Sequence, residues 1–149
     1  MVLDRDITVR EILETTGQKV VYRTTPTTSA REAASKMREK KISSLVVSAD
    51  GTMVGIVTER DFTWRCVAEG KDPETTSVAE IMTADPKTVS LFTSAKECEN
   101  LMIELEARHV PVMDQGENVG IVSIRDLLFV TRRDRDFLAQ QALGYIRGG

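Results

Sequence analysis

Two short segments of the chain combine a hydroxyl, an arginine and a carboxylate at the same spacing. Thr58-Glu59-Arg60-Asp61 follows one apolar run, and Ser123-Ile124-Arg125-Asp126 follows another. A hydroxyl where a strand turns into a helix lies beside unpaired amide donors and the positive end of the helix dipole, which favours a phosphate. A carboxylate one turn further on can accept hydrogen bonds from both hydroxyls of a ribose. Residues of these types at this spacing therefore have the chemistry to contact a phosphate and a sugar diol.

A simpler interpretation applies to the same segments, because a hydroxyl followed three residues later by an acid is also an acceptable helix N-cap. Capping boxes ordinarily have Glu or Gln at the fourth position, as Ser29-x-x-Glu32 and Ser94-x-x-Glu97 do in this chain. Both segments carry the shorter Asp instead, which favours ligand contact. The hydroxyl can serve both purposes, since capping and phosphate binding use neighbouring amides.

The two segments belong to an internal repeat. Sliding the sequence against itself by 65 residues aligns residues 28–32 with 93–97 and residues 55–61 with 120–126, without a gap. Residues 8–13 also match residues 77–82, at a slightly larger offset. We therefore divide the chain into a first unit with an N-terminal helix (1–70), a linker (71–76), a second unit (77–130) and a C-terminal helical extension (131–149).

Each unit is expected to run in the order short helix, strand, helix, strand, turn, strand and helix. Apolar strands without polar alternation flank turns at Asp50-Gly51 and Gln115-Gly116. Such strands are buried on both faces, so we expect helices to cover the sheets and the two units to complete one another's burial. The apolar stripes of the middle helices are Ala30, Ala33, Ala34 and Met37, and Ala95, Cys98, Met102 and Leu105.

The repeated segments 55–61 and 120–126, the strand pairs before them and residues 78–83 resemble the CBS motif. Two such motifs in tandem resemble a CBS pair, or Bateman module, over almost the whole chain. The resemblance implies an α/β (α+β) fold of two small three-stranded sheets with covering helices, related by a pseudo-two-fold axis. It also implies clefts between the copies that commonly bind AMP, ADP, ATP or S-adenosylmethionine, and it implies dimerisation.

By this resemblance, each cleft joins the Asp segment of one copy to the first strand and second-strand entrance of the other. The cleft of Asp126 is expected to use Ser123, Arg125, Arg108 and His109 near the phosphates and Thr24, Thr25, Ala30 and Ser44 around the base and ribose. The cleft of Asp61 is expected to use Thr58, Arg60, Val89, Ser90 and Ala95. Serines replace Arg108 and His109 there, and Lys40 or Lys41 is the candidate to compensate. We therefore expect the Asp126 cleft to bind a phosphorylated ligand more tightly.

His109 is the single histidine, and three roles are open for it: a surface or edge residue, a phosphate contact, or a catalytic or metal-binding group. One histidine and two distant thiols do not supply a zinc site. The chain has neither a GxxxxGK[ST] loop nor a GxGxxG motif, and no nucleophile elbow supports a catalytic serine. We therefore expect no metal, no covalently bound cofactor, no catalytic residues and no enzymatic activity.

The final helix after Leu127 is expected to continue for about twenty residues, further than its counterpart, which stops near Gly70. Val130, Phe137, Leu138, Ala142, Tyr145 and Ile146 recur along it at near-helical spacing. Two interpretations remain open: the helix packs back on its own domain, or it forms a dimer seam or partner-docking surface.

Composition narrows the classes of function. The net charge of −3 at pH 7 argues against a general affinity for nucleic acid or anionic lipid, and no apolar run approaches the ~20 residues of a membrane span. The N-terminus lacks the pattern of a secretory signal, so we expect a cytoplasmic protein, or one in an organelle matrix after removal of a transit peptide. Two cysteines are too few for a disulfide scaffold, and Cys98 is expected to be a packing residue.

Two functions from different classes are therefore weighed. In the favoured one, an adenosyl ligand in the inter-copy cleft changes the balance between conformations of a homodimer or a partner complex and reports energy status to a target protein. In the alternative, the chain is a ligand-free interaction or scaffold protein, with Cys66 as a thiol-redox handle beside Arg65.

Overall fold

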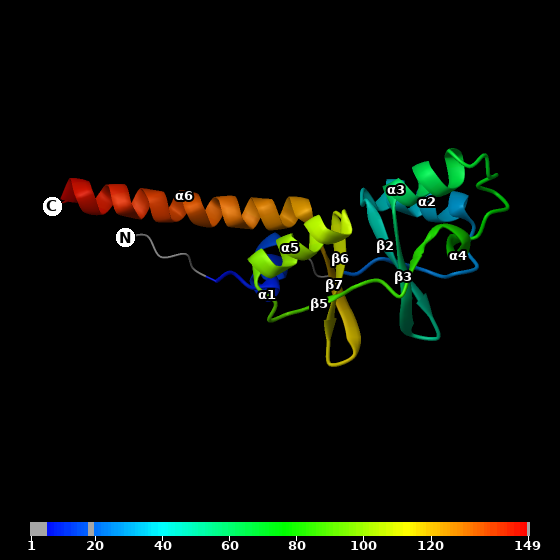
Figure 1. Cartoon of the computed structure of the whole chain (residues 1–149), viewed down its shortest axis with the longest axis horizontal. Coiled ribbons are helices and arrows are strands. Elements are labelled where there is room, and N and C mark those ends of the chain that lie inside the picture. Colours follow the sequence, from blue (N-terminus) through cyan, green and yellow to red (C-terminus); the bar gives the residue numbers. More distant parts are fainter. Residues whose placement is uncertain (1–5, 18–19, 149) are drawn as a thin grey trace.

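The computed structural model describes residues 6–17 and 20–148, which form two similar halves and a long terminal helix that extends away from them (Figure 1). The helices are α1 (Val9–Thr16), α2 (Ala30–Lys40), α3 (Glu59–Asp61), the π-helix η1 (Phe62–Val67), α4 (Val78–Ile81), α5 (Ala95–Leu105) and α6 (Ile124–Gly148). The strands are β1 (Arg23–Thr24), β2 (Ser44–Ala49), β3 (Thr52–Thr58), β4 (Thr83–Ala84), β5 (Val89–Ser90), β6 (His109–Asp114) and β7 (Glu117–Ser123).

Each half is built on a small mixed sheet, which confirms the α+β class. The second sheet has the order β5-β6-β7, with β5 parallel to β6 and a β6–β7 hairpin. The first sheet repeats this plan as β1-β2-β3 and adds β4 at its edge, where Ala84 pairs with Gly55, so it has four strands rather than the expected three. The extra strand exists because the chain leaving α4 runs back along β3.

The hairpin turns lie where the sequence predicts them. Asp50 and Gly51 both have positive φ angles, 51° and 77°, and Gln115 and Gly116 have φ angles of 49° and 80°. Two successive residues of positive φ make the tight turn whose twist matches that of the flanking strands. Both hairpins also carry one irregularity in register, between Val47 and Ser48 and at the equivalent place in the second half.

The two short helices exchange halves. α1 precedes the first sheet in the chain, yet its Val9 and Ile12 lie in the hydrophobic core of the second half, and the Val9 amide donates to the Thr93 carbonyl at 2.8 Å. α4 does the converse, because Val78 and Ile81 lie in the core of the first half. The sequence repeat places each helix with the strands that follow it, so the packing units differ from the predicted units 1–70 and 77–130.

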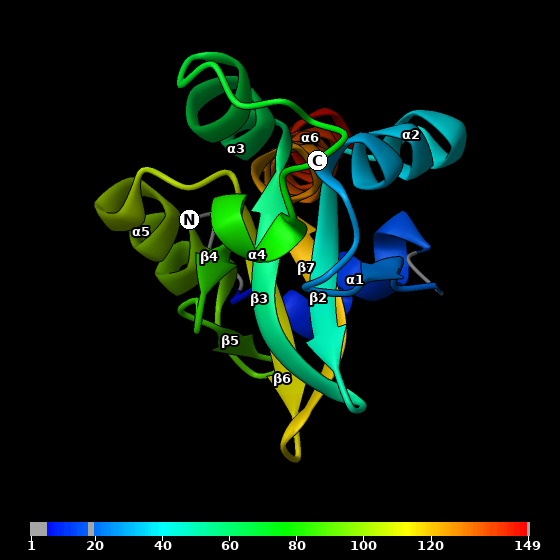
Figure 2. The same ribbon diagram turned by 90° about the vertical axis from the view of Figure 1, so that its right-hand side faces the viewer.

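A third apolar cluster lies between the two sheets, which stand face to face (Figures 1 and 2). Val46 of β2, Ile56 of β3 and Ile121 of β7 form it, and all three are buried. The opposite faces of the same strands contribute to the two helix-covered cores. This confirms that the apolar strands are buried on both faces and that each copy completes the burial of the other.

The middle helices begin and pack as predicted, with one exception. Ser29 Oγ accepts a hydrogen bond from the Glu32 amide at 3.1 Å, and Ser94 and Glu97 form a full capping box. Cys98 is fully buried, which confirms its role in packing. Leu105 was expected on the buried stripe of α5, but it is 40% exposed because the helix ends there with a left-handed turn at Glu106.

The terminal helix α6 packs on the second half only through its first turns, where Leu127 and Val130 are buried. Beyond them the helix projects from the body as a single rod (Figure 1). Four large apolar side chains on it are more than half exposed: Leu128, Phe129, Phe137 and Leu143. Most of the extension therefore does not pack back on its own domain. Within the described residues, no helix is both long and apolar enough to cross a bilayer.

Candidate functional site

Two cavities open along the boundary between the halves. The Asp126 cavity, of about 1030 Å³, brings Ser123, Arg125 and Asp126 of the second half against α2 and the entrance of β2 in the first. The Asp61 cavity, of about 910 Å³, brings Thr58, Arg60 and Asp61 against the segment between α5 and β6. Each of the two repeated segments thus faces a cavity completed by the other half.

The Asp126 carboxylate is available for a ligand. Asp126 is half-buried on the cavity wall, and its backbone amide donates to Ser123 Oγ at 3.1 Å. The serine hydroxyl therefore caps α6, as the simpler interpretation holds, while the carboxylate itself accepts no hydrogen bond from the part of the chain that the structure describes.

The Asp61 carboxylate, by contrast, closes a capping box. Its Oδ2 accepts from the Thr58 amide at 2.8 Å and from Thr58 Oγ1 at 3.3 Å, and its Oδ1 lies 3.9 Å from Arg65 Nε. Asp61 is only 7% exposed, and burial raises its pKa, against the opposing effects of the Thr58 hydrogen bonds and Arg65. In the first copy the capping interpretation holds for the carboxylate as well as for the hydroxyl.

The two arginines of the repeated segments differ in the same way. Arg60 Nη1 donates to the Glu106 carbonyl at 2.6 Å, and its guanidinium stacks on Trp64 with 5.0 Å to the ring centroid. Arg125 lines both cavities and forms no hydrogen bond or ion pair with the described residues. The second copy therefore presents a free carboxylate and a free guanidinium where the first copy has engaged both.

His109 lies between the two cavities rather than on the outer surface. Its Nε2 is 2.8 Å from Ser43 Oγ, so the two side chains form a hydrogen bond that crosses from one half to the other. Burial lowers the pKa of His109, the nearby Arg108 and Arg60 guanidiniums lower it further, and Asp126 opposes them. The imidazole is therefore neutral at pH 7 and can take part in only one hydrogen bond as donor.

Several residues predicted for the clefts lie elsewhere. Thr24, Ala30, Val89 and Ala95 are buried in the sheets and cores, and the Thr25 and Ser90 side chains bond within their own turns. None of these six described residues lines either cavity, whereas Ser44 and His109 do line the Asp126 cavity. Arg108, predicted near Asp126, lines the Asp61 cavity instead, and Lys41 lines the Asp126 cavity.

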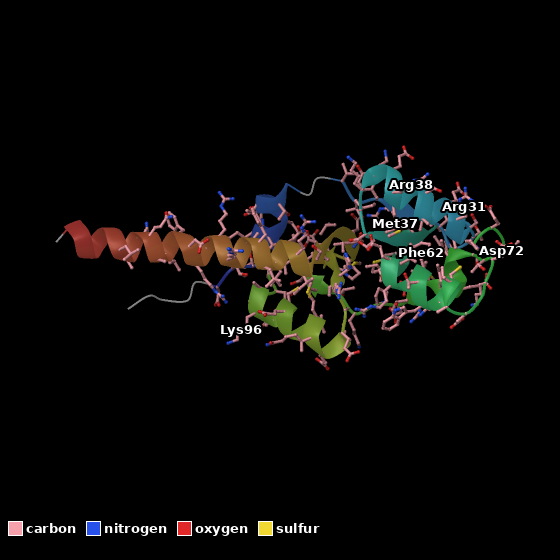
Figure 3. The ribbon with its side chains drawn as sticks, turned by 90° about the horizontal axis from the view of Figure 1, so that it is seen from above. Arg31, Met37, Arg38, Phe62, Asp72 and Lys96 are labelled. Carbon is pink, nitrogen blue, oxygen red and sulfur yellow. The ribbon has the colours of Figure 1, made fainter. Side chains whose placement is uncertain are left out.

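The cavities also contain residues that the repeat did not indicate. Val21, Met37, Phe62 and Ile121 give the Asp126 cavity an apolar wall, beside Arg38 at the end of α2. Seen from above, Met37 and Arg38 on α2 lie next to Phe62 (Figure 3). Lys87 and Trp64 line the Asp61 cavity. Of these additional lining residues, only those at the end of α2 could have been suspected from the sequence, because lysine and arginine recur there.

The Asp61 cavity has more cations than the two serines aligned with Arg108 and His109 indicate. Arg60, Arg65, Lys87, Arg108 and Arg125 all line it, although the first two are engaged with backbone carbonyls. These cations come from four different segments of the chain. Aligning the two repeats compares the residues of only one such segment, the one that enters the second strand, and so does not count the others. Among the described residues, no group of three metal-ligating side chains converges at any point.

Fold and cavities together define a duplicated α+β module whose two copies enclose a pair of inter-copy cavities. The chain belongs to the CBS domain family, which matches residues 18–66 and 78–133. Its members are regulatory modules.

Individual relatives agree with this assignment. An uncharacterised protein of Methanopyrus kandleri is 34% identical over 128 residues, which are 85% of this chain and 63% of that protein, so the chain spans less than two thirds of this relative. A CBS-domain protein of Agrobacterium tumefaciens has a solved structure with a TM-score of 0.78, 31% identity and coverage of 83% of this chain and 98% of that one. A hexameric CBS-CP12 protein from bloom-forming cyanobacteria has a TM-score of 0.76, 28% identity and coverage of 85% and 73%.

Proposed function

We propose that this chain is a regulatory CBS pair that binds an adenosine-containing ligand, such as AMP, ADP, ATP or S-adenosylmethionine, in the Asp126 cavity. The observation that carries the proposal is the Asp126 carboxylate, which is half-buried on the cavity wall with no donor among the described residues. A ribose diol supplies two donors to such an acceptor, and charge-assisted hydrogen bonds of this kind contribute about 1.5–3 kcal/mol each.

The other walls of the Asp126 cavity suit the remaining parts of the ligand. Val21, Met37 and Ile121 offer apolar surface for a flat base, and Arg125 and Lys41 are cations that can contact phosphate oxygens. S-adenosylmethionine carries no phosphate, but its methionine carboxylate is an anion that the same cations can contact. Apolar lining with a few polar groups is the usual composition of a small-molecule site.

Such a ligand would regulate by binding two conformations of the module with different affinities. Its site is formed by both halves, so closure of one half on the other changes the cavity directly. We propose a second copy of the chain as the partner on α6, where four large apolar side chains are exposed, and the cyanobacterial relative shows that this fold occurs in oligomers. Light scattering tests this partner by measuring the molar mass in solution. We expect the parent protein to be an oligomer and Phe137→Glu to be a monomer.

Calorimetric titration with AMP, ADP, ATP and S-adenosylmethionine tests the binding site. Asp126→Asn keeps the shape of the side chain and removes its charge, and Asp61→Asn makes the same change in the other cavity. We expect at least one ligand to bind, Asp126→Asn to weaken it about tenfold or more, and Asp61→Asn to change it little. The 2′,3′-dideoxy form of the ligand should bind the parent protein more weakly than the ligand itself does, by the same free energy as the Asp126→Asn change costs. In Asp126→Asn the ligand and its dideoxy form should bind equally well.

Unchanged affinity in Asp126→Asn would disprove the assignment of the diol to this carboxylate. If none of the four ligands binds, the sensor proposal fails and the alternative of a ligand-free interaction protein is favoured. A ligand-free scaffold has no site that distinguishes ribose from dideoxyribose. The dideoxy analogue therefore separates the sensor function from the scaffold function even where binding is weak.

A further inference from the structure

The two cavities lie back to back and share one wall. Five residues line both cavities: Ser43, Glu59, His109, Ser123 and Arg125. Within this wall, the 2.8 Å hydrogen bond between Ser43 Oγ and His109 Nε2 joins the first half to the second. A single layer of side chains therefore separates the contents of one cavity from those of the other.

Arg125 is the cation of the shared wall that no other group has engaged. Its side chain is exposed and forms no hydrogen bond or ion pair with the described residues, whereas its repeat counterpart Arg60 is bonded to the Glu106 carbonyl. A guanidinium binds a phosphate best through a pair of parallel hydrogen bonds, and the donors and charge used for one phosphate are then less available to a second. Arg125 lies on the wall of both cavities, so a phosphate in one cavity weakens what Arg125 offers to the other.

The Asp61 cavity has the means to hold an anion but not a ribose. Lys87 and Arg108 line only this cavity, and neither side chain forms a hydrogen bond or ion pair with the described residues. The Asp61 carboxylate, which would have to accept hydrogen bonds from a ribose diol, already accepts one from the Thr58 amide. Glu59, Asp85 and Glu106 share the walls, so an anion must make direct contacts with the basic groups rather than rely on the net charge.

We propose that the Asp61 cavity is a second site, for a compact phosphate anion without a ribose, held by Lys87, Arg108 and Arg125, and that its occupancy opposes phosphate binding in the Asp126 cavity. The opposition has two causes. The two anions compete for Arg125, and like charges on either side of one side chain repel each other. The opposition is reciprocal, because coupling between two binding equilibria is equal in both directions. Only this second half of the proposal rests on the proposed function.

Titration of the full chain with inorganic pyrophosphate tests the site without any nucleotide. Lys87→Met and Arg108→Met should each weaken pyrophosphate binding about tenfold, which corresponds to ~1.4 kcal/mol. Lys41→Met is the matched control, because Lys41 lines only the Asp126 cavity, and it should leave this binding unchanged. The proposal is overturned if pyrophosphate does not bind at millimolar concentration, or if Lys41→Met weakens it and Lys87→Met does not.

The coupling is tested by titrating AMP at increasing concentrations of pyrophosphate. The apparent Kd of AMP should rise about tenfold and then reach a plateau, because both ligands can still be bound together. Arg125→Met should weaken both ligands and abolish most of the rise, and adenosine, which lacks a phosphate, should not respond. A rise without limit would show direct competition in one cavity and overturn the coupling, as would no rise at all.

If none of AMP, ADP, ATP and S-adenosylmethionine binds, the proposed function and the coupling fail together, while the pyrophosphate titration still decides the second site. If ADP or ATP binds and AMP does not, that nucleotide takes the place of AMP in the coupling titration. If AMP binds through Asp126 and pyrophosphate does not bind, the proposed function stands and the second site is refuted. The two failures are therefore distinguishable.

Discussion

Ser43 and His109 are not equivalent positions of the repeat, yet their side chains form the hydrogen bond that crosses between the two halves, at 2.8 Å. The repeat relates Ser43 to Arg108 and Ser44 to His109. The crossing contact thus breaks the pseudo-symmetry of the module at the wall between its cavities. It also gives a titratable group, the His109 imidazole, a structural role in joining the halves.

Ser43→Ala is expected to lower the free energy of unfolding by about 1 kcal/mol, because the half-buried His109 Nε2 loses its partner. Urea denaturation measures the change. Ser35→Ala is the control, since Ser35 is a half-buried serine of α2 without a side-chain hydrogen bond to the described residues, and it should change stability by less than about 0.5 kcal/mol. Equal effects of the two variants would contradict the role of the Ser43–His109 bond.

Stability is expected to decrease as the pH falls below about 6.5, the usual pKa of an unfolded-state histidine. Burial, helped by Arg108 and Arg60, lowers the pKa of His109 in the folded chain. Between the folded and unfolded pKa values the unfolded chain binds a proton that the folded chain does not, so unfolding is favoured. The loss should end once the pH is below the folded pKa.

Urea denaturation between pH 8 and pH 5 measures this dependence, and the difference between the parent and His109→Asn isolates it. Asp61 contributes with the opposite sign at lower pH. Burial raises its pKa above 3.8, so its contribution to stability is greatest below that value and is lost as the pH rises through the folded pKa. An identical pH profile for His109→Asn and the parent would refute the assignment to His109.

Asp61→Ala and Asp126→Ala are expected to differ in stability although they occupy equivalent positions. Removing Asp61 leaves the Thr58 amide without its 2.8 Å partner and should cost about 1 kcal/mol, the usual value of a lost cap. Removing Asp126 breaks no hydrogen bond to its carboxylate among the described residues and should cost less than about 0.5 kcal/mol. Thermal denaturation without ligand compares the two, and equal losses would show that the asymmetry of the carboxylates has no energetic consequence.

Gly55→Ala is expected to destabilise the first sheet by about 2 kcal/mol or more, an overpacking effect. A Cβ at this position would lie 2.7 Å from Met82 Sδ and 2.8 Å from the Thr83 carbonyl, where the chain after α4 crosses β3. Gly144→Ala is the control, because nothing lies within 4 Å of its Cβ and alanine favours a helix. Calorimetry that finds Gly55→Ala neutral would mean that β4 is not held against β3.

Both cysteines are expected to be inert in the folded protein. Cys66 and Cys98 are 1% and 0% exposed, and burial raises the pKa of Cys98 to about 11, so almost no thiolate is present at neutral pH. Ellman's reagent should detect no thiol in native protein and two after unfolding. Rapid reaction of Cys66 in the native chain would instead support the thiol-redox alternative.

The local parts of this fold could be read from the sequence. Ser29 and Ser94 start helices, Asp50-Gly51 makes a hairpin turn, and Cys98 packs in a core, because each depends on neighbours within a few residues or on a short apolar period. The repeat then implies two similar halves, since two copies of one local pattern must fold alike. The pairing of each Asp segment with the opposite copy followed from the resemblance, not from the residues alone.

The difference between the two copies of the Asp segment has a local part and a tertiary part. Arg65 lies four residues after Asp61 and approaches its carboxylate, where Val130 stands in the other copy, so this part can be read from the sequence. The tertiary part is the hydrogen bond from Arg60 to the Glu106 carbonyl, 46 residues away, since Arg125 has no such bond to the described residues. Likewise, which half each short helix covers depends on burial across the whole chain, because an apolar helix of four to eight residues fits either core and its sequence does not specify one.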